Sequence, residues 1–226
     1  TFDGTVPDAG IVLQLAGQEE KLKPQGYTLA VEPGRVVIAG ADEPGLYYGT
    51  VTFFQLLRHA LKRVAEAPQV PCAAIVDWPD TPNRLLRLEH PHTFRNYPVR
   101  ENRGIDYLIQ WTDRFVAGNK FNTFYVDLSA NVRYARRPEM NGSDKLYSLA
   151  DLRRFGDFCR DRFIDLCPAF QVGGHANWWL TIGYHPELRA KGWKSQGDVT
   201  HPDHDPIVYD CMLDVIEALR PKYVSP

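Results

Sequence analysis

The spacing of hydrophobic residues in the first part of the chain changes from a strand-like to a helix-like pattern. Short runs rich in β-branched and apolar residues occupy 11–15, 27–32 and 35–39, and the Pro-Gly pair between the last two is typical of a tight hairpin. From 45 to about 61 the apolar residues recur at helical spacing and form one face. With a last short run at 72–76, the pattern predicts a small α+β domain, residues 1–76, of three or four strands and one amphipathic helix.

Strands and helices alternate in the remainder, residues 77–226. The pattern predicts strands at 84–90, 121–128 and 165–172, helices at 103–118, 148–163 and 206–219, and the start of a fourth strand at Tyr223-Val224. Ser148 followed by Asp151 resembles a capping box at the start of the middle helix. The strands lack polar alternation, which favours a parallel sheet made of βαβ units.

Loop lengths separate two α/β architectures. Long loops follow the expected strands and short links precede them, which is typical of a (β/α)8 TIM barrel with its active site at the carboxyl ends of the strands. A complete doubly wound, flavodoxin-like protein is the alternative, but no GxGxxG or phosphate-binding loop follows any strand. A closed barrel needs about 250 residues. We therefore expect only its first three to four βα units here, with a missing C-terminal half or a homo-oligomer partner covering the open edge.

Composition narrows the class of protein. The chain has 226 residues, 44% of them hydrophobic, and a net charge of −2, which creates no field that would attract nucleic acid or an anionic membrane. No stretch is long and apolar enough for a transmembrane helix. The four cysteines form no CxxC motif, and we expect Cys159 and Cys211 to be buried free thiols. The chain begins at Thr1 without a visible leader, and we expect a bacterial-type periplasmic or secreted protein.

Four segments, in this order, resemble family 20 glycoside hydrolases, the β-N-acetylhexosaminidases. Residues 45–57 (GLYYGTVTFFQLL) resemble the helix of their small N-terminal domain. Asp77-Trp78-Pro79, followed by Arg84, resembles the segment that leads to the first barrel strand, and 120–122 (KFN) resembles the Lys-x-Asn that opens the second. Residues 168–175 resemble the Pro-Glu-x-Asp-x-Pro-Gly-His end of the third strand. The resemblance implies a hydrolase that uses no metal and no cofactor.

The chain departs from the family pattern at several acidic positions. Ala130, with Asn131 next to it, stands where the family has Asp, and Ala169 and Gln171 replace the Glu and Asp of the third-strand motif. The family's catalytic Asp-Glu pair follows the fourth strand, about where this chain ends, so we expect that pair outside these residues. An α-glucuronidase-like or uncharacterised barrel hydrolase, or a barrel that binds carbohydrate without cleaving it, is the alternative.

Polar and aromatic residues near the expected strand ends are the candidates for carbohydrate chemistry. They are Arg84, Glu89, His90, His92, Asp127, Asn131, Arg133, His175, Trp178 and Trp179. Glycoside cleavage needs an acid for the leaving oxygen, and in substrate-assisted enzymes the acetamido oxygen of the sugar is the nucleophile. We regard His175 and Glu89 as the candidate catalytic residues. The candidate substrate-binding residues are Arg84, Asp127, Asn131, Arg133, His175, Trp178 and Trp179. The resemblance implies that Arg84 binds the sugar of the −1 subsite.

Each candidate also has a structural interpretation. Arg84 or Glu89 would form an ion pair, and Asp127 would form a buried pair that stabilises the fold. His175 would have its hydrogen bonds satisfied within the protein, and one of the two tryptophans would pack in the core. His90-Pro91-His92 and the histidines of 201–205 lack the spacing of a helical HExxH zinc site, and we expect no metal there.

Overall fold

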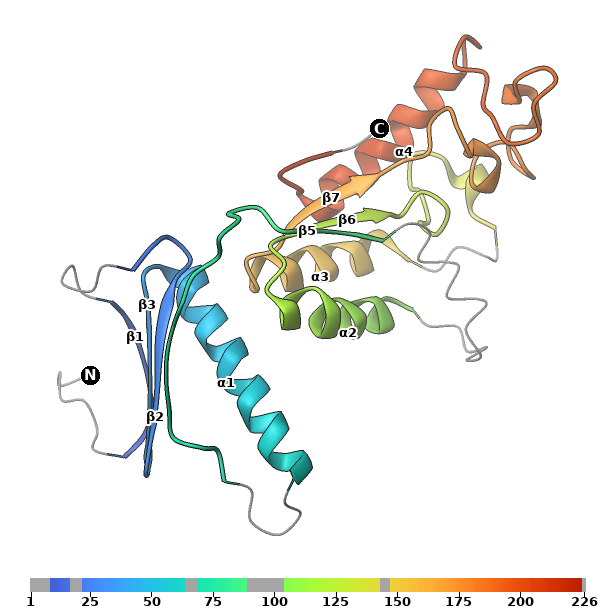
Figure 1. The fold of residues 1–226 in the computed structure, drawn as a ribbon. Helices are drawn as coiled ribbons and strands as arrows, with labels where there is room; N and C mark the ends of the chain where they lie inside the picture. Colours follow the sequence, from blue (N-terminus) through green and yellow to red (C-terminus); the bar gives the residue numbers. More distant parts are fainter. Residues whose placement is uncertain (1–8, 17–21, 64–68, 89–103, 143–146, 225–226) are drawn as a thin grey trace. The chain divides into compact units, whose positions relative to one another are not determined.

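The computed structural model describes residues 9–16, 22–63, 69–88, 104–142 and 147–224 (Figure 1). Its contacts divide the chain into two compact units. Unit 1 comprises Thr1–Arg84 together with Gly118–Lys120, and unit 2 comprises Leu85–Ala117 and Phe121–Pro226. The sequence pattern placed a domain boundary before Asp77, whereas in the structure Asp77 ends a strand of the first sheet and pairs with Tyr27.

In the part of unit 1 that the structure describes, the chain forms a four-stranded sheet with one helix. The order of its strands is β1-β3-β2-β4, and α1 packs against the sheet; the bounds are β1 Gly10–Leu15, β2 Tyr27–Glu32, β3 Arg35–Gly40, α1 Glu43–Arg63 and β4 Ala73–Asp77. The expected hairpin is confirmed, because β2 and β3 are antiparallel and Gly34 in their turn has a φ of 79°. The predicted strands and amphipathic helix of this region all form.

Glycines allow α1 to lie close to the sheet. A Cβ on Gly49 would be 2.4 Å from Ile38 Cγ2, and one on Gly45 would be 2.2 Å from the carbonyl oxygen of Gly26. Ile38 is completely buried, and the side chains of Tyr27 and Tyr48 are each only 2% exposed. Glycine is therefore needed at these two positions of the 45–57 segment, because a larger side chain at either one would push the helix away from the sheet.

The described residues of unit 2 form three parallel strands and three main helices. The strands lie in the sequential order β5-β6-β7; the bounds are β5 Leu85–Leu88, α2 Ile105–Phe115, β6 Thr123–Asp127, α3 Leu149–Arg160, β7 Asp165–Ala169 and α4 His204–Leu219. The Ser148–Asp151 capping box is confirmed, with both of its hydrogen bonds present. The parallel sheet of βαβ units is also confirmed.

Alternate residues of the strands face two different environments. Phe124 in β6 packs against Trp111 of α2 and Phe155 of α3, with ring centroids 5.8 and 6.4 Å apart. Both crossover helices therefore cover the same face of the sheet (Figure 1). A flavodoxin-like sheet has the strand order 2-1-3-4-5, in which the first strand lies between the second and the third, so the sequential order β5-β6-β7 argues against that alternative.

Two expectations at the ends of strands are wrong. Tyr223 and Val224 form no strand; both are about two-fifths exposed and have no neighbouring strand with which to pair among the described residues. The third strand was expected to reach residue 172, but β7 ends at Ala169. Its next carbonyls accept hydrogen bonds from side chains and loop amides instead of from a strand.

Candidate functional site

The carboxyl ends of the parallel strands bring several expected residues to one edge of the sheet. Asp127 is the last residue of β6 and lies opposite Ala169, the last residue of β7. Asn131 and Arg133 follow β6, and His175 follows β7. We call this region of unit 2 the strand-end edge, and it is where parallel α/β sheets bind their ligands.

Asp127 is buried and has local partners. Its Oδ1 accepts hydrogen bonds from the backbone nitrogen of Ser129 at 3.1 Å and from the Ser129 hydroxyl at 2.6 Å. The hydroxyl of Tyr134 donates to the Ser129 carbonyl at 2.6 Å, which ties the loop after β6 together. Burial raises the pKa of Tyr134 well above its ordinary value, and negative charge at Cys211, Asp127 and Asp214 raises it further. Tyr134 is therefore a neutral hydrogen-bond donor.

Asn131 and Arg133 lie on a loop that pairs with Tyr147. The Asn131 carbonyl accepts from the Tyr147 amide at 2.9 Å, and the Arg133 amide donates to the Tyr147 carbonyl at 2.8 Å. The side-chain Nδ2 of Asn131 is buried without a hydrogen-bond partner among the described residues. An unsatisfied buried donor costs about 1–3 kcal/mol, which makes Asn131 the most informative residue of this loop. Arg133 is exposed.

His175 follows two glycines and has a left-handed backbone, with a φ of 58°. Its side chain is exposed. Trp179 is completely buried and packs against Phe170 and Tyr134, so the structure supports core packing for this tryptophan rather than stacking on a sugar. Nothing is described of the Trp178 side chain. Glu89, His90 and His92 lie outside the described residues.

Arg84 does not join the strand-end edge. It immediately precedes β5, at the amino end of the parallel strands, so the expectation that it lies with the other candidates is wrong. Its Nε donates to the Lys120 carbonyl at 2.7 Å, and its terminal nitrogens donate to the carbonyls of Thr81 and Pro82 and to the Gln25 side chain. These contacts within unit 1 support a structural role. The motif spacing placed Arg84 near a strand without showing at which end.

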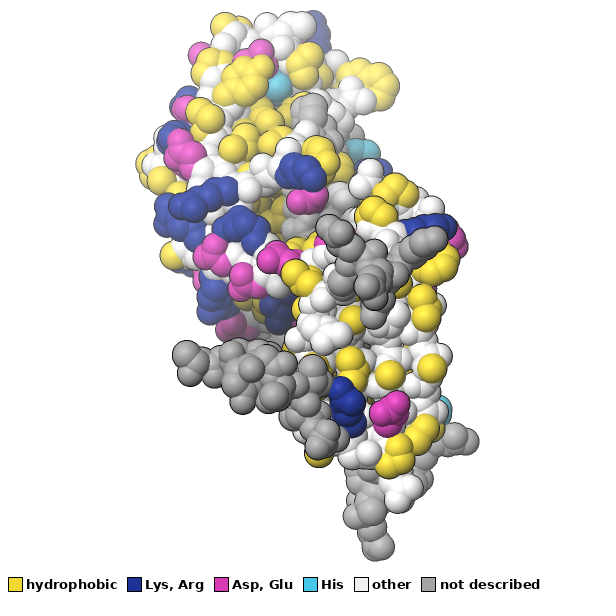
Figure 2. All heavy atoms as spheres, turned by 90° about the vertical axis from the view of Figure 1, so that its left-hand side faces the viewer, with side chains coloured by type: hydrophobic (Ala, Val, Ile, Leu, Met, Phe, Trp, Pro, Cys, Tyr) yellow, Lys and Arg dark blue, Asp and Glu magenta, His cyan; other side chains and the backbone are white. Residues whose placement is uncertain are grey.

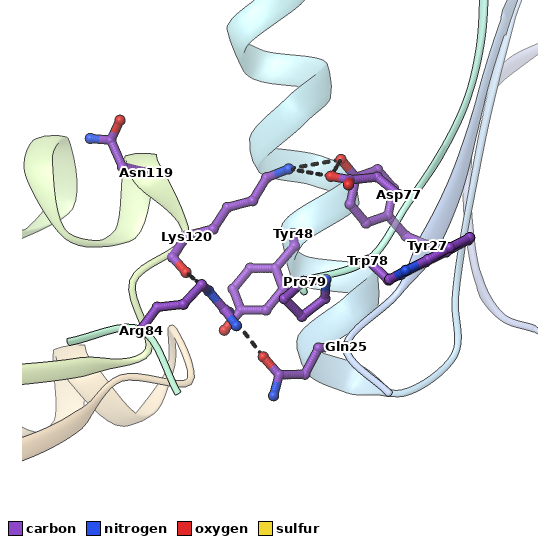
Figure 3. Close-up of a pocket in the computed structure, with 9 residues that line it drawn as sticks. All are labelled: Gln25, Tyr27, Tyr48, Asp77, Trp78, Pro79, Arg84, Asn119 and Lys120. Carbon is purple, nitrogen blue, oxygen red and sulfur yellow. Dashed lines mark hydrogen bonds and ion pairs between the residues drawn. The ribbon is translucent and has the colours of Figure 1, made fainter. Parts of the chain in front are cut away.

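Unit 1 contains a pocket of about 160 Å³ beside Arg84 (Figure 3). At one side of it, Lys120 Nζ donates to the Tyr27 hydroxyl at 2.8 Å and to Asp77 Oδ2 at 3.1 Å, and Tyr27 donates to Asp77 at 2.8 Å. The polar groups of this pocket thus bind one another and hold residues 118–120 on the sheet of unit 1. The strand-end edge, in unit 2, remains the candidate site.

Electrostatics in this triad follow from partial burial. Burial raises the pKa of Tyr27 far above its ordinary value, and the negative charge of Asp77 adds to the effect. Burial alone would raise the pKa of Asp77 too, but hydrogen bonds from Tyr27 and Lys120 and the Lys120 charge outweigh it and lower that pKa. Tyr27 is accordingly neutral and Asp77 ionised at neutral pH.

Two buried polar residues of α4, Asp214 and His204, were not among the candidate site residues. Asp214 Oδ2 accepts the backbone amides of Ala135 and Arg136 at 2.7 and 3.0 Å, and its Oδ1 accepts from the Arg136 guanidinium at 2.5 Å. His204 contacts the Val172 carbonyl at 2.9 Å. Both occupy positions of a helix that is otherwise apolar on its buried face, and a polar residue in such a pattern was the available signal.

Charges of both signs are mixed on the surface. On the face drawn in Figure 2, Lys and Arg side chains lie beside Asp and Glu side chains, in keeping with the net charge of −2. Within the described ranges, no three His, Cys, Asp or Glu side chains are grouped in a way that would hold a metal ion. None of the helices in those ranges has the length and apolar character needed to cross a bilayer.

Comparisons with known proteins converge on one family. Residues 3–78 match the family described as glycosyl hydrolase family 20, domain 2. A β-hexosaminidase of Akkermansia muciniphila is 27% identical over 184 residues, which cover 72% of this chain and 35% of that protein.

Solved structures show the same fold over both units. An N-acetyl-β-hexosaminidase of Streptomyces plicatus matches 95% of this chain with a TM-score of 0.73 and 22% identity, and the chain covers 46% of it. A family 20 β-N-acetylhexosaminidase of Streptomyces coelicolor matches 96% of this chain with a TM-score of 0.76 and 22% identity, and the chain covers 47% of it. A chitobiase of Flavobacterium johnsoniae matches 98% of the chain with a TM-score of 0.73 and 19% identity, at 34% of its own length.

The chain thus spans less than half the length of each of these relatives. The likeness to the solved structures shows the fold, and the match at 3–78 adds the family of the first unit. Together they confirm the resemblance drawn from the sequence: residues 3–78 match domain 2 of glycosyl hydrolase family 20, and the chain as a whole is similar to β-N-acetylhexosaminidases.

Proposed function

We propose that this chain is part of a glycoside hydrolase that acts on β-N-acetylhexosaminides. The observation that carries the proposal is the strand-end edge, where Asp127, Asn131 and His175 follow the carboxyl ends of two adjacent parallel strands. The matched family domain in the same chain supports it. The substrate is a carbohydrate with a 2-acetamido group.

The architecture that we propose for unit 2 is the beginning of a (β/α)8 barrel. Sequential parallel strands with α2 and α3 on one face are the arrangement that a barrel repeats around its axis. The opposite face carries the exposed Arg87 and the half-buried Tyr125, whose guanidinium and ring lie 4.8 Å apart. In a closed barrel these side chains would fill the interior. A further part of a longer protein, or a second copy of this chain, would cover the open edge.

The mechanism that we propose is substrate-assisted and retaining. The acetamido oxygen of the sugar attacks the anomeric carbon, and an acid protonates the leaving oxygen. An Asp-Glu pair after a fourth strand would supply the acid and orient the amide. The residues of this chain would bind the sugar: Asn131 Nδ2 is a buried donor with no partner among the described residues, and Asp127 and His175 offer polar groups at the same edge.

Turnover by site variants tests this assignment. Kinetics are measured with an aryl N-acetyl-β-glucosaminide and the full-length protein that contains this chain. Replacing Asn131 or His175 by Ala is expected to lower kcat/KM by about 10-fold to 1000-fold, because each change removes a hydrogen-bonding group that contributes about 1.5–4 kcal/mol in the transition state. His59→Ala, at an exposed position of α1, is the control. Unchanged kcat/KM in both site variants would contradict the assignment.

A barrel that binds carbohydrate without cleaving it is the second candidate. Ala130, Ala169 and Gln171 stand where the family has acids, and this loss of carboxylates favours it. Saturable binding of N-acetylglucosamine oligomers without any turnover would establish that function. Turnover of an aryl glucuronide in place of the N-acetylglucosaminide would instead support the α-glucuronidase-like alternative.

A further inference from the structure

Three consecutive backbone carbonyls just beyond β7 each accept a hydrogen bond from a different donor. The Gln171 carbonyl accepts from Trp179 Nε1 at 3.0 Å, the Val172 carbonyl from His204 Nε2 at 2.9 Å, and the Gly173 carbonyl from the Gly197 amide at 2.9 Å. We call this set of bonds the carbonyl latch. Its three donors come from the loop after β7 and from the first residue of α4, all within unit 2.

His204 is the polar side chain that makes the central bond. It is 2% exposed, and its other ring nitrogen, Nδ1, lies 2.9 Å from Asp205 Oδ1. A carbonyl oxygen only accepts hydrogen bonds, so Nε2 must carry a proton.

Tight packing leaves the latch little room to move. A Cβ on Gly197 would lie 3.3 Å from both the Val172 carbonyl oxygen and the Ala176 Cβ, and 3.6 Å from His204 Nε2. The titratable groups around the imidazole include Asp198, whose pKa is lowered mainly by hydrogen bonds from Thr200 and further by the charges of His201 and His204. The ring thus sits in a packed environment, with the carboxylates of Asp205 and Asp198 and the His201 side chain among its neighbours.

The position of the latch relates it to the candidate site. Its last carbonyl, that of Gly173, precedes His175 by two residues, and His175 has the left-handed backbone that such a sharp turn requires. With the three carbonyls fixed, the turn and the side chain that follows it have a defined location at the strand-end edge. Without the latch, two glycines would leave this segment many conformations.

We propose that His204 is a positioning residue, which fixes the backbone of 171–173 and thereby places His175. The role of His175 in carbohydrate chemistry rests on the proposed function; the latch itself does not. The inference therefore has a structural readout and a kinetic one, and the two fail separately.

Hydrogen exchange of the Gly197 amide is the structural readout, because that amide donates to the latch. In His204→Leu, which is apolar and of similar size, we expect this amide to exchange about 10-fold or more faster relative to amides in the middle of β6. His204→Gln can still donate to the Val172 carbonyl, and we expect its exchange to stay within about two-fold of the parent protein. Tyr209→Ala, at an exposed position of α4, is the matched control.

Nuclear magnetic resonance of the parent protein provides a test that needs no variant, should His204→Leu not fold. Nitrogen-15 shifts of the His204 ring are expected to show a proton on Nε2. An unprotonated Nε2 overturns the proposal. Equal Gly197 exchange in the parent protein and His204→Leu overturns it too, as does equally fast exchange in the Gln and Leu variants.

The kinetic readout separates the latch from the proposed function. If the protein cleaves N-acetylglucosaminides, His204→Leu is expected to lower kcat/KM by about 10-fold while His204→Gln stays near the parent value. Full activity in a folded His204→Leu protein, with the Gly197 amide exposed, overturns the positioning role. Absence of cleavage by the parent protein contradicts the proposed function alone, and the His175 amide shift then reports whether His204 places that residue.

Discussion

At the scale of single residues, the Tyr27–Asp77–Lys120 triad shows how unit 1 holds a distant piece of chain. Lys120 has a left-handed backbone, with a φ of 59°, and its carbonyl accepts from Arg84 while its ammonium binds Asp77. Lys120 therefore bonds through both its main chain and its side chain. Asp77 is 47% exposed, so water screens its ion pair with Lys120 and the pair stabilises unit 1 only modestly.

The lowered pKa of Asp77 makes unit 1 sensitive to acid. A carboxyl with a lower pKa in the folded state stabilises that state above its unfolded pKa of about 3.9, and this contribution is lost as the pH falls through the folded pKa. We expect Asp77→Asn to lower the free energy of unfolding of unit 1 by about 1 kcal/mol or less at pH 7. As the pH falls below about 4, we expect this variant to lose less stability than the parent protein.

Exchange of the β2 amides, followed from pH 7 downward, measures this effect. Asp80→Asn is the control, because Asp80 is an exposed carboxylate three residues further along. A pH dependence that is the same in Asp77→Asn and in the parent protein would show that the Asp77 contacts do not contribute.

The four cysteines differ in exposure, and their reactivity should follow. Cys72 is exposed, Cys167 is intermediate, and Cys159 and Cys211 are buried, as expected from the sequence for the last two. Burial raises the pKa of Cys159 far above its ordinary value and also raises that of Cys167. At pH 8, mass spectrometry after iodoacetamide treatment should show Cys72 labelled first and Cys159 at least about 100-fold more slowly. Equal rates would contradict the packing of α3.

At the scale of elements, the contact between α1 and its sheet depends on Gly49. Alanine at an open helical position stabilises a protein by about 1 kcal/mol relative to glycine. Here the added methyl would meet Ile38 Cγ2, so we expect Gly49→Ala to lower the free energy of unfolding of unit 1 by about 1–3 kcal/mol. Denaturant unfolding measures the change, with the exposed His59→Ala of the same helix as the control. A stabilised Gly49→Ala protein would refute this packing.

The elements were largely predictable because their signals are local. The Pro33-Gly34 turn, the Ser148 cap and the apolar periods of the helices act within a few residues, and the structure confirms each of them. The ends of the strands were less predictable. β7 stops at Ala169 because donors distant in sequence bind the following carbonyls, and no local pattern announces such partners.

Positions of side chains in the candidate site were predictable only in part. Parallel strands place Asp127 and Asn131 near one edge as the alternation of elements implied, because that alternation fixes strand direction. Arg84 was misplaced, since a motif gives the order of residues but its contacts with Gln25 and Lys120 depend on the tertiary fold. Trp179 was equally ambiguous, because an aromatic residue near a strand end satisfies both a core and a ligand-binding interpretation.

At the scale of the whole molecule, the two units differ in how they relate to known proteins. Unit 1 is a sheet-and-helix domain whose sequence matches a known family domain. Unit 2 has three parallel strands whose outer neighbours are absent from the described residues, and the relatives that it resembles are more than twice as long. The proposal that the strand-end edge of unit 2 binds carbohydrate is therefore the part of the account that experiments have to test.

Dependence of turnover on the acetamido group tests the central claim most directly. The full-length protein is assayed with an aryl N-acetyl-β-glucosaminide and with the matching aryl β-glucoside, which lacks the internal nucleophile. The account predicts that kcat/KM is at least about 1000-fold higher for the N-acetylated substrate, because the neighbouring amide replaces a bimolecular attack. Equal turnover of both substrates, or turnover of neither, would contradict it.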